Sequence, residues 1–189
     1  MRLNSASALG TTDLLRIGCW VCVNGIAAWL GGSLIARESP QGAAVIFGLI
    51  LGLLQSTAIS QTWGEAVAWA ALTSMAFPLA VFFVVIPTFL TVYGLVQELW
   101  FASGLMGLIV GAALGLAQSA VFVMRDAPGR VTALWTLGNS VALALVVAIA
   151  LADPLAGDGL ARGAYGAAFG VLTSLPLAAV LMEARASER

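Results

Sequence analysis

The chain has 189 residues, of which 61% are hydrophobic and only 9% are charged, and its formal net charge is −1 at pH 7. Soluble domains usually carry about 25% charged residues. Because so few charges cannot cover a water-exposed surface, the composition predicts an integral membrane protein. The near-zero net charge and the lack of any run of like charges argue against a nucleic-acid partner.

The chain contains no histidine, and its two cysteines are Cys19 and Cys22. Histidine is the commonest metal ligand and the usual general base near neutral pH, so a haem or pigment held by imidazole and a Ser-His-Asp site are both excluded. Two thiols fall short of a four-ligand zinc site. We therefore expect no enzymatic activity, no catalytic residue, no metal site and no cofactor. A lipid or pigment held without histidine stays open.

Six continuous apolar runs are each long enough to cross a membrane, because about 20 helical residues span the ~30 Å hydrocarbon layer. The runs are continuous rather than alternating, which favours helices over strands. The expected fold class is all-α, a polytopic membrane helix bundle in one domain over 1–189, with six transmembrane helices. These run from about Leu14 to Ala36, Gln41 to Gln61, Gly64 to Ile86, Phe101 to Met124, Val131 to Leu151 and Ala161 to Met182.

The arginines indicate the orientation, because cytoplasmic loops of membrane proteins carry an excess of basic residues. With a cytoplasmic N-terminus, only Arg37 and Arg162 lie outside. The inner side then holds Arg2, Arg16, Arg125, Arg130, Arg185 and Arg189. We therefore expect a multi-pass protein of the bacterial cytoplasmic (inner) membrane with both termini in the cytoplasm.

Two patterns recur in alternate helices. The second, fourth and sixth helices each contain G-x-x-x-G-x-x-[QT]-S, and the first, third and fifth each contain W-x-x-x-[NT]-[GS]. The recurrence predicts an internal repeat, a two-helix hairpin used three times, over about 14–61, 64–124 and 131–182.

The middle hairpin is the longest, and its excess falls at about 87–100. This apolar insertion is too short to cross a membrane, and we expect it to lie at the interface or to re-enter the bilayer. It either forms a lid or docking surface or serves only as a long connection.

The repeated glycines are expected to pack helices together. Residues four positions apart share one helix face, and pairs of glycines on that face let a neighbouring helix approach closely. The six packing glycines are Gly48, Gly52, Gly111, Gly115, Gly166 and Gly170.

The repeated polar side chains fall at one depth, in the inner half of all six expected helices. Buried amides are costly without partners, so these side chains should bond to one another. They form either a clasp that fixes helix order or the lining of a small neutral pocket. They are Asn24, Gln55, Thr73, Gln118, Asn139 and Thr173.

The segments ending at Gln55 and Gln118 resemble those of uncharacterised bacterial multi-pass membrane proteins with repeated G-x-x-x-G-x-x-Q hairpins. Those proteins often continue with tryptophan, whereas Ser56 and Ser119 follow here. The resemblance transfers no function.

No charged side chain is expected at mid-membrane, which argues against ion-coupled transport. We expect a non-catalytic integral membrane subunit, an accessory subunit that packs against lipids and partner subunits. The alternative is a small permease or channel for a neutral solute, using the inner polar layer.

Overall fold

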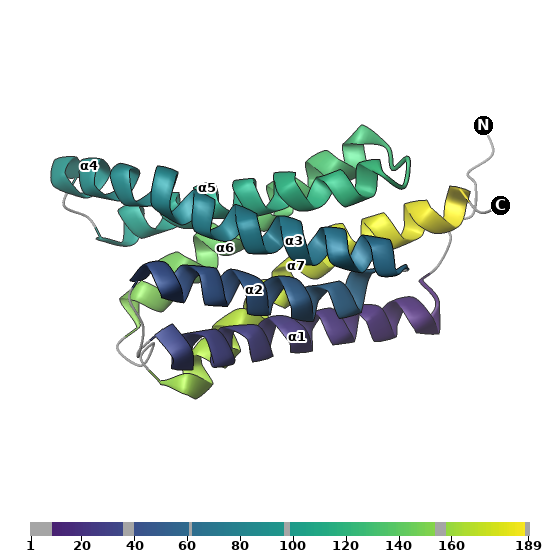
Figure 1. Cartoon of the computed structure of the whole chain (residues 1–189), viewed down its shortest axis with the longest axis horizontal. Coiled ribbons are helices and arrows are strands. Elements are labelled where there is room, and N and C mark those ends of the chain that lie inside the picture. The colour runs from purple at the N-terminus through teal and green to yellow at the C-terminus, as the bar shows by residue number, and fades with distance from the viewer. Residues whose placement is uncertain (1–8, 36–39, 61, 97–98, 154–157, 188–189) are drawn as a thin grey trace.

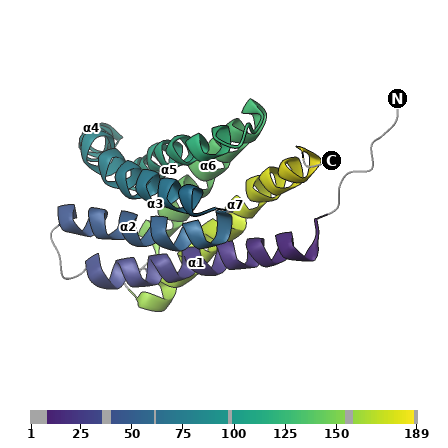
Figure 2. The same cartoon turned by 45° about the vertical axis from the view of Figure 1, so that its right-hand side comes forward.

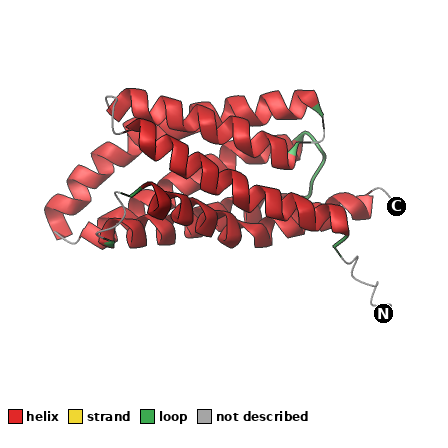
Figure 3. Ribbon diagram, turned by 90° about the horizontal axis from the view of Figure 1, so that it is seen from below, coloured by secondary structure: helices red, strands yellow, loops and turns green. Residues whose placement is uncertain are grey.

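The computed structural model describes residues 9–35, 40–60, 62–96, 99–153 and 158–187, and these residues form helices joined by short turns, with no strand among them (Figure 3). This confirms the expected all-α class. In chain order the elements are α1 (Thr11–Ile35), α2 (Pro40–Ile59), α3 (Trp63–Ala80), the π-helical turn η1 (Val81–Val85), α4 (Ile86–Val96), α5 (Leu99–Val123), α6 (Gly129–Ala152) and α7 (Gly159–Ser187).

Five helical segments of the described chain are long and apolar enough to cross a membrane. A multi-pass membrane protein requires such segments, because a helix satisfies its own backbone hydrogen bonds in lipid. A shorter apolar segment, Ala44–Ile59, lies within α2. The five longer segments are Thr11–Gly31, Trp63–Val92, Phe101–Val123, Gly129–Ala150 and Gly159–Glu183.

The helix beginning at Trp63 does not end at about Ile86, and that sequence-based expectation is wrong. The chain stays helical through η1 and into α4, with the Ile86 N–H donating to the Val81 carbonyl five residues earlier. The wider turn shifts the hydrogen-bond register next to Pro87, which has no N–H of its own to place. Residues 87–96 of the insertion therefore extend α3 instead of forming a separate piece, and residues 99–100 begin α5.

Local signals explain the start of α3 and the turn between α5 and α6. The Thr62 hydroxyl accepts from the Glu65 N–H at 3.3 Å, and the Glu65 carboxylate accepts from the Thr62 N–H at 3.1 Å. This capping box satisfies two N–H groups that a helix start leaves open. After α5, Asp126 adopts a positive φ of 54°, a conformation that aspartate tolerates better than most residues.

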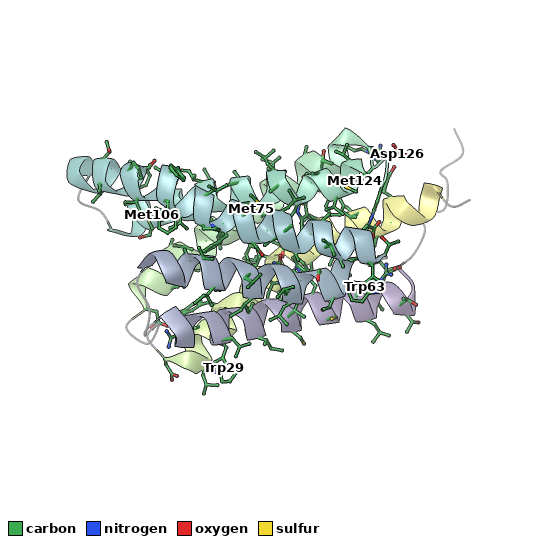
Figure 4. The ribbon with its side chains drawn as sticks, in the orientation of Figure 1. Trp29, Trp63, Met75, Met106, Met124 and Asp126 are labelled. Carbon is green, nitrogen blue, oxygen red and sulfur yellow. The ribbon has the colours of Figure 1, made fainter. Side chains whose placement is uncertain are left out.

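α1 begins and α7 ends at one end of the bundle, which we call the proximal end; the opposite end is the distal end (Figure 1). Trp63 is 87% exposed towards the proximal end and Trp29 is 48% exposed towards the distal end (Figure 4). Tryptophan gathers at both water interfaces of a membrane. The two exposed indoles therefore agree with a bundle that crosses a bilayer.

The closest helix pairs are α2 with α3, α5 with α6, and α7 with α1 (Figure 2). The last pair brings together the two ends of the chain and closes the bundle into a ring. Each pair combines a G-x-x-x-G helix with a tryptophan helix. All three pairs join helices of different expected hairpins, so the tightest packing lies between the hairpins and not within them.

The repeated glycines face the partner helix of each pair. A Cβ atom would lie 2.7 Å from the Ala70 carbonyl oxygen at Gly52, 2.7 Å from the Thr136 Cα at Gly115, and 2.8 Å from the Val21 Cα at Gly170. Side chains do not fit at such distances from a neighbouring backbone. The preceding glycines, Gly48, Gly111 and Gly166, face the same partners one turn away.

Candidate functional site

Three tryptophans form a triangle at the centre of the bundle. Trp20 of α1, Trp69 of α3 and Trp135 of α6 are each 0% exposed. Their ring centroids lie 5.5–6.2 Å apart in edge-to-face arrangements, the geometry that the quadrupoles of aromatic rings favour. Phe122 of α5 packs against Trp69 and Trp135. Together these rings fill the middle of the bundle.

Each buried indole N–H donates to the polar residue of the paired G-x-x-x-G helix. Trp20 donates to Thr173 Oγ1 at 2.8 Å. Trp69 donates to Gln55 Oε1 at 3.4 Å, and Trp135 donates to Gln118 Oε1 at 3.2 Å. The same bond therefore occurs in all three helix pairs. It satisfies a donor that would otherwise be costly to bury.

The amides form a second layer, one helical turn further towards the distal end. Gln118 Nε2 donates to Gln55 Oε1 at 2.9 Å and to Thr73 Oγ1 at 3.0 Å. Gln55 Nε2 donates in turn to Asn24 Oδ1 at 2.8 Å. Four of the predicted polar residues, from α1, α2, α3 and α5, thus belong to one hydrogen-bond network.

The other two predicted residues bond differently. Asn139 Nδ2 donates to the carbonyl oxygen of Trp135 at 2.9 Å, as Asn24 does to that of Trp20 at 2.8 Å. Thr173 donates to the carbonyl oxygen of Phe169 in its own helix at 2.8 Å. Threonine is shorter than glutamine, so it reaches the Trp20 indole but no further helix. All six polar residues are at most 2% exposed.

At the proximal end, an ion pair ties α3 to the end of α5. Arg125 Nε and Nη2 donate to the two Glu65 carboxylate oxygens at 2.8 and 2.7 Å, and Nη2 also donates to the Ile59 carbonyl at 3.1 Å. Both side chains are about 15% exposed. A bidentate pair of this kind fixes geometry as well as adding energy.

On the distal side of the amide layer lies a cavity of about 250 Å³. Asn24 forms its floor, and apolar side chains from all six long helices form its walls. It reaches Ala150 near the end of α6 and Arg162 and Tyr165 in the first turns of α7. The Tyr165 hydroxyl donates to the Asp153 carboxylate. The core is thus filled proximally and hollow distally.

Among the described residues, no group of three His, Cys, Asp or Glu side chains is placed to hold a metal ion. Cys19 and Cys22 are exposed on the surface of α1, away from the polar layer. The site chemistry available at the centre is therefore hydrogen bonding by neutral groups.

Sequence reasoning missed three parts of this arrangement. It used the tryptophans as repeat markers but did not place their indoles against the glutamines. It used Arg125 and Arg162 only to orient the chain, without the Glu65 partner of Arg125 or the cavity that Arg162 lines. The recurring W-x-x-x-[NT] spacing was a signal for the first part; the others depend on how helix ends meet in space.

Comparison of the chain with protein-family models, with curated proteins and with solved structures finds no match.

Proposed function

We propose that this chain is a non-catalytic integral membrane subunit that packs against partner subunits in the bacterial inner membrane. The observation that carries the proposal is the closure of the polar layer upon itself. Gln118 and Gln55 use both their donors and their acceptors on neighbouring helices and indoles. Polar side chains that bond to one another in this way hold the helices together. They leave few hydrogen-bond donors and acceptors with which to bind a substrate.

The centre of the bundle also blocks a water-filled path. On the proximal side of the amide layer lie five large apolar side chains that are 0% exposed: Trp20, Trp69, Trp135, Phe122 and Leu177. A water file needs two to four polar partners at each position, and this apolar plug offers few. The arrangement supports a clasp over a conducting pore.

The membrane topology that we propose has six crossings. α2 has 20 residues, which at 1.5 Å each reach about 30 Å, the thickness of the hydrocarbon layer. With six crossings both termini lie on one side, and the arginine count places that side in the cytoplasm. The proximal end is then the cytoplasmic end.

We further propose that the bundle descends from one hairpin used three times. The three indole bonds are equivalent, and matching shallow grooves support the same conclusion. One groove lies between α2 and α3 at Ser56 and Ala70, and the other lies between α5 and α6 at Ser119 and Thr136. These residues occupy the same positions relative to the glycine and tryptophan motifs.

The surface that we assign to a partner is the extension formed by η1 and α4. α4 reaches beyond the other helices at the distal end (Figure 1). Phe83 and Leu90 are 75% and 67% exposed on this extension. An apolar helix that leaves its own bundle offers a face that another membrane helix can cover.

The test is affinity purification of the full chain from its native membranes in a mild detergent. We expect a partner membrane protein to be recovered in stoichiometric amount. Leu90→Ala should reduce that recovery, whereas Leu137→Ala, at a 63% exposed position on α6, should not. Recovery of a monodisperse chain with no partner would rule the proposal out.

A permease for a neutral solute is the second candidate, and the observation in its favour is the cavity that meets Asn24. Liposomes containing the purified chain should then take up a small solute such as glycerol faster than empty liposomes. Replacing Gln55 and Gln118 together with leucine should abolish uptake without loosening the fold. A lowered melting temperature in the same variant favours the clasp instead.

The orientation has its own test in a variant whose two cysteines are replaced by serine. Single cysteines are then placed at the proximal position Gly129 and the distal position Asp158, both exposed. A membrane-impermeant maleimide applied to intact cells should label the distal cysteine alone. Labelling of the proximal cysteine alone would invert the proposed topology.

A further inference from the structure

The distal cavity has room for a guest. It begins at Asn24 and continues along α6 from Leu143 to Ala150, seven residues that rise about 10 Å. Its volume of about 250 Å³ exceeds that of an engineered apolar cavity of roughly 150 Å³ that admits benzene while staying free of water. A molecule larger than one benzene ring therefore fits.

The walls determine what kind of guest is favoured. Phe47 of α2 and Phe77 of α3 line the cavity with their ring centroids 4.8 Å apart, and Phe169 lines it from α7. An aromatic guest gains from ring-to-ring contact beyond the apolar area that it buries. A charged guest would lose its hydration on such walls without compensation. The walls therefore favour a neutral molecule with a flat ring.

The polar groups towards the distal end already have partners within the protein. Arg162 and Tyr165 line the cavity there, and both interact with other groups of the chain. The Tyr165 hydroxyl donates to the Asp153 carboxylate. A guest therefore has no need to bring an opposite charge.

Asn24 has hydrogen-bonding capacity left at the opposite end of the cavity. A carboxamide nitrogen carries two hydrogens. Asn24 Nδ2 donates one of them to the Trp20 carbonyl oxygen at 2.8 Å, and Asn24 Oδ1 accepts from Gln55 Nε2 at 2.8 Å. The second Nδ2 hydrogen bonds to no other residue that the structure describes. Because Asn24 is 2% exposed and lines the cavity, a guest is placed to accept this hydrogen.

We propose that the cavity binds a small neutral aromatic carbonyl compound. Its carbonyl oxygen accepts a hydrogen bond from the Asn24 amide, and its ring lies against Phe47, Phe77 and Phe169. The site is independent of the proposed subunit function, because no described residue of the α4 extension lines the cavity.

The test is equilibrium dialysis of the full chain in phosphatidylcholine nanodiscs, with empty nanodiscs measured in parallel. The probes are 2-acetylnaphthalene, its isostere 2-isopropenylnaphthalene, which lacks the oxygen, and the ketone with both rings saturated. Affinities are expressed relative to the concentration of each probe in the bilayer, so that partitioning into lipid does not enter the comparison. The aryl ketone should bind saturably and about two- to tenfold more tightly than the alkene, the range expected of one hydrogen bond between neutral groups.

The saturated ketone should also bind more weakly than the aryl ketone, because it cannot make ring-to-ring contacts. Equal binding of the aryl ketone and the alkene would overturn the bond to Asn24. A saturated ketone that binds as tightly as the aryl ketone would overturn the aromatic specificity. Absence of saturable binding would overturn the whole proposal.

A pair of variants locates the binding. Val146→Phe fills the cavity and should remove saturable binding of the aryl ketone, whereas Val141→Phe, at a 51% exposed position of the same helix, should bind it as the unmodified chain does. If Val146→Phe does not fold, Ala28→Leu fills the same cavity from α1. Unchanged binding of the aryl ketone in a folded cavity-filling variant would refute the site.

A second pair tests the hydrogen bond to Asn24. Threonine occupies the equivalent position of α3, where Thr73 accepts from Gln118 as Asn24 accepts from Gln55. Asn24→Thr therefore keeps an acceptor but removes the amide hydrogens, and should lower the affinity for the aryl ketone to that for the alkene. The control Asn139→Thr makes the same change in α6 at a residue that does not line the cavity, and should alter neither affinity. A preference for the ketone that persists in folded Asn24→Thr would overturn the assignment.

Discussion

The two halves of this bundle are built from the same helices but packed in opposite ways. In the proximal half, Trp20, Trp69 and Trp135 fill the axis, and the indole N–H of each of the three has a partner. In the distal half, starting at the Asn24 amide, a cavity of about 250 Å³ lies between apolar walls. The difference shows that the recurring motif specifies the proximal half, while the distal half departs from close packing.

The two halves also differ in the chemical groups that they contain. The axis of the proximal half concentrates hydrogen bonds among neutral groups, which fix how the helices are rotated against each other, and the ion pairs of the described residues lie only at its outer end. The distal half contains the cavity, with a cation at its mouth. Substitutions can test each half separately.

The largest effect is expected from a side chain placed between α5 and α6. In Gly111→Leu the new Cβ would lie 2.7 Å from the Ser140 Cα, so the helices must separate. We expect a loss of about 3 kcal/mol in the free energy of unfolding, measured by denaturation in mixed micelles. The control is Gly18→Leu, where no atom lies within 4 Å. Equal losses in both variants would show that α5 and α6 do not pack as described.

The second largest loss of stability is expected when the Gln118 amide is removed. Gln118→Leu deprives the Trp135 indole of its acceptor and Gln55 of a donor, which should cost about 2 kcal/mol. The control is Thr57→Val, whose exposed hydroxyl donates only to Leu54 of its own helix. In the double variant with Gln55→Leu, the loss should be smaller than the sum of the single losses, because the two amides share a bond. Additive losses would contradict the network.

A smaller difference in stability is expected between variants of two arginines at the proximal end. Arg125→Gln breaks a bidentate pair whose side chains are about 15% exposed, and should lower the free energy of unfolding by about 1.5 kcal/mol. Arg130→Gln breaks the pair with Glu183, where the arginine side chain is 75% exposed. Exposed pairs contribute little, so this variant should stay within about 0.5 kcal/mol. Thermal unfolding of both variants in one detergent provides the comparison.

The smallest effect should come from the hollow half. Val146→Phe adds apolar volume to an existing cavity, so it should raise the free energy of unfolding by up to about 1 kcal/mol instead of lowering it. Val141→Phe on the lipid-facing side should change it less. If Val146→Phe destabilises the chain as strongly as Gly111→Leu does, the distal half is packed as tightly as the proximal half, and the comparison fails.

Much of the fold could be predicted because lipid imposes simple rules on each segment. Helical runs near Leu14–Ala36 and Val131–Leu151 follow from length and hydrophobicity alone, and the observed α1 and α6 begin and end within a few residues of them. The helix end expected at about Ile86 was wrong because a π-helical turn lets the helix continue. The depth of the polar residues followed from their positions along the helices.

What the sequence determined by itself is therefore one-dimensional: which segments are apolar helices, and where along its helix each glycine, amide and indole lies. The tertiary structure decided which helices pair, that Gln118 reaches Gln55 and Thr73 while Thr173 reaches only Trp20 and its own helix, and that a cavity remains beside Arg162. The physical reason is that hydrophobicity and helix geometry act within a segment. Pairing and cavities depend on helix rotation and side-chain reach, which only contacts between distant segments fix.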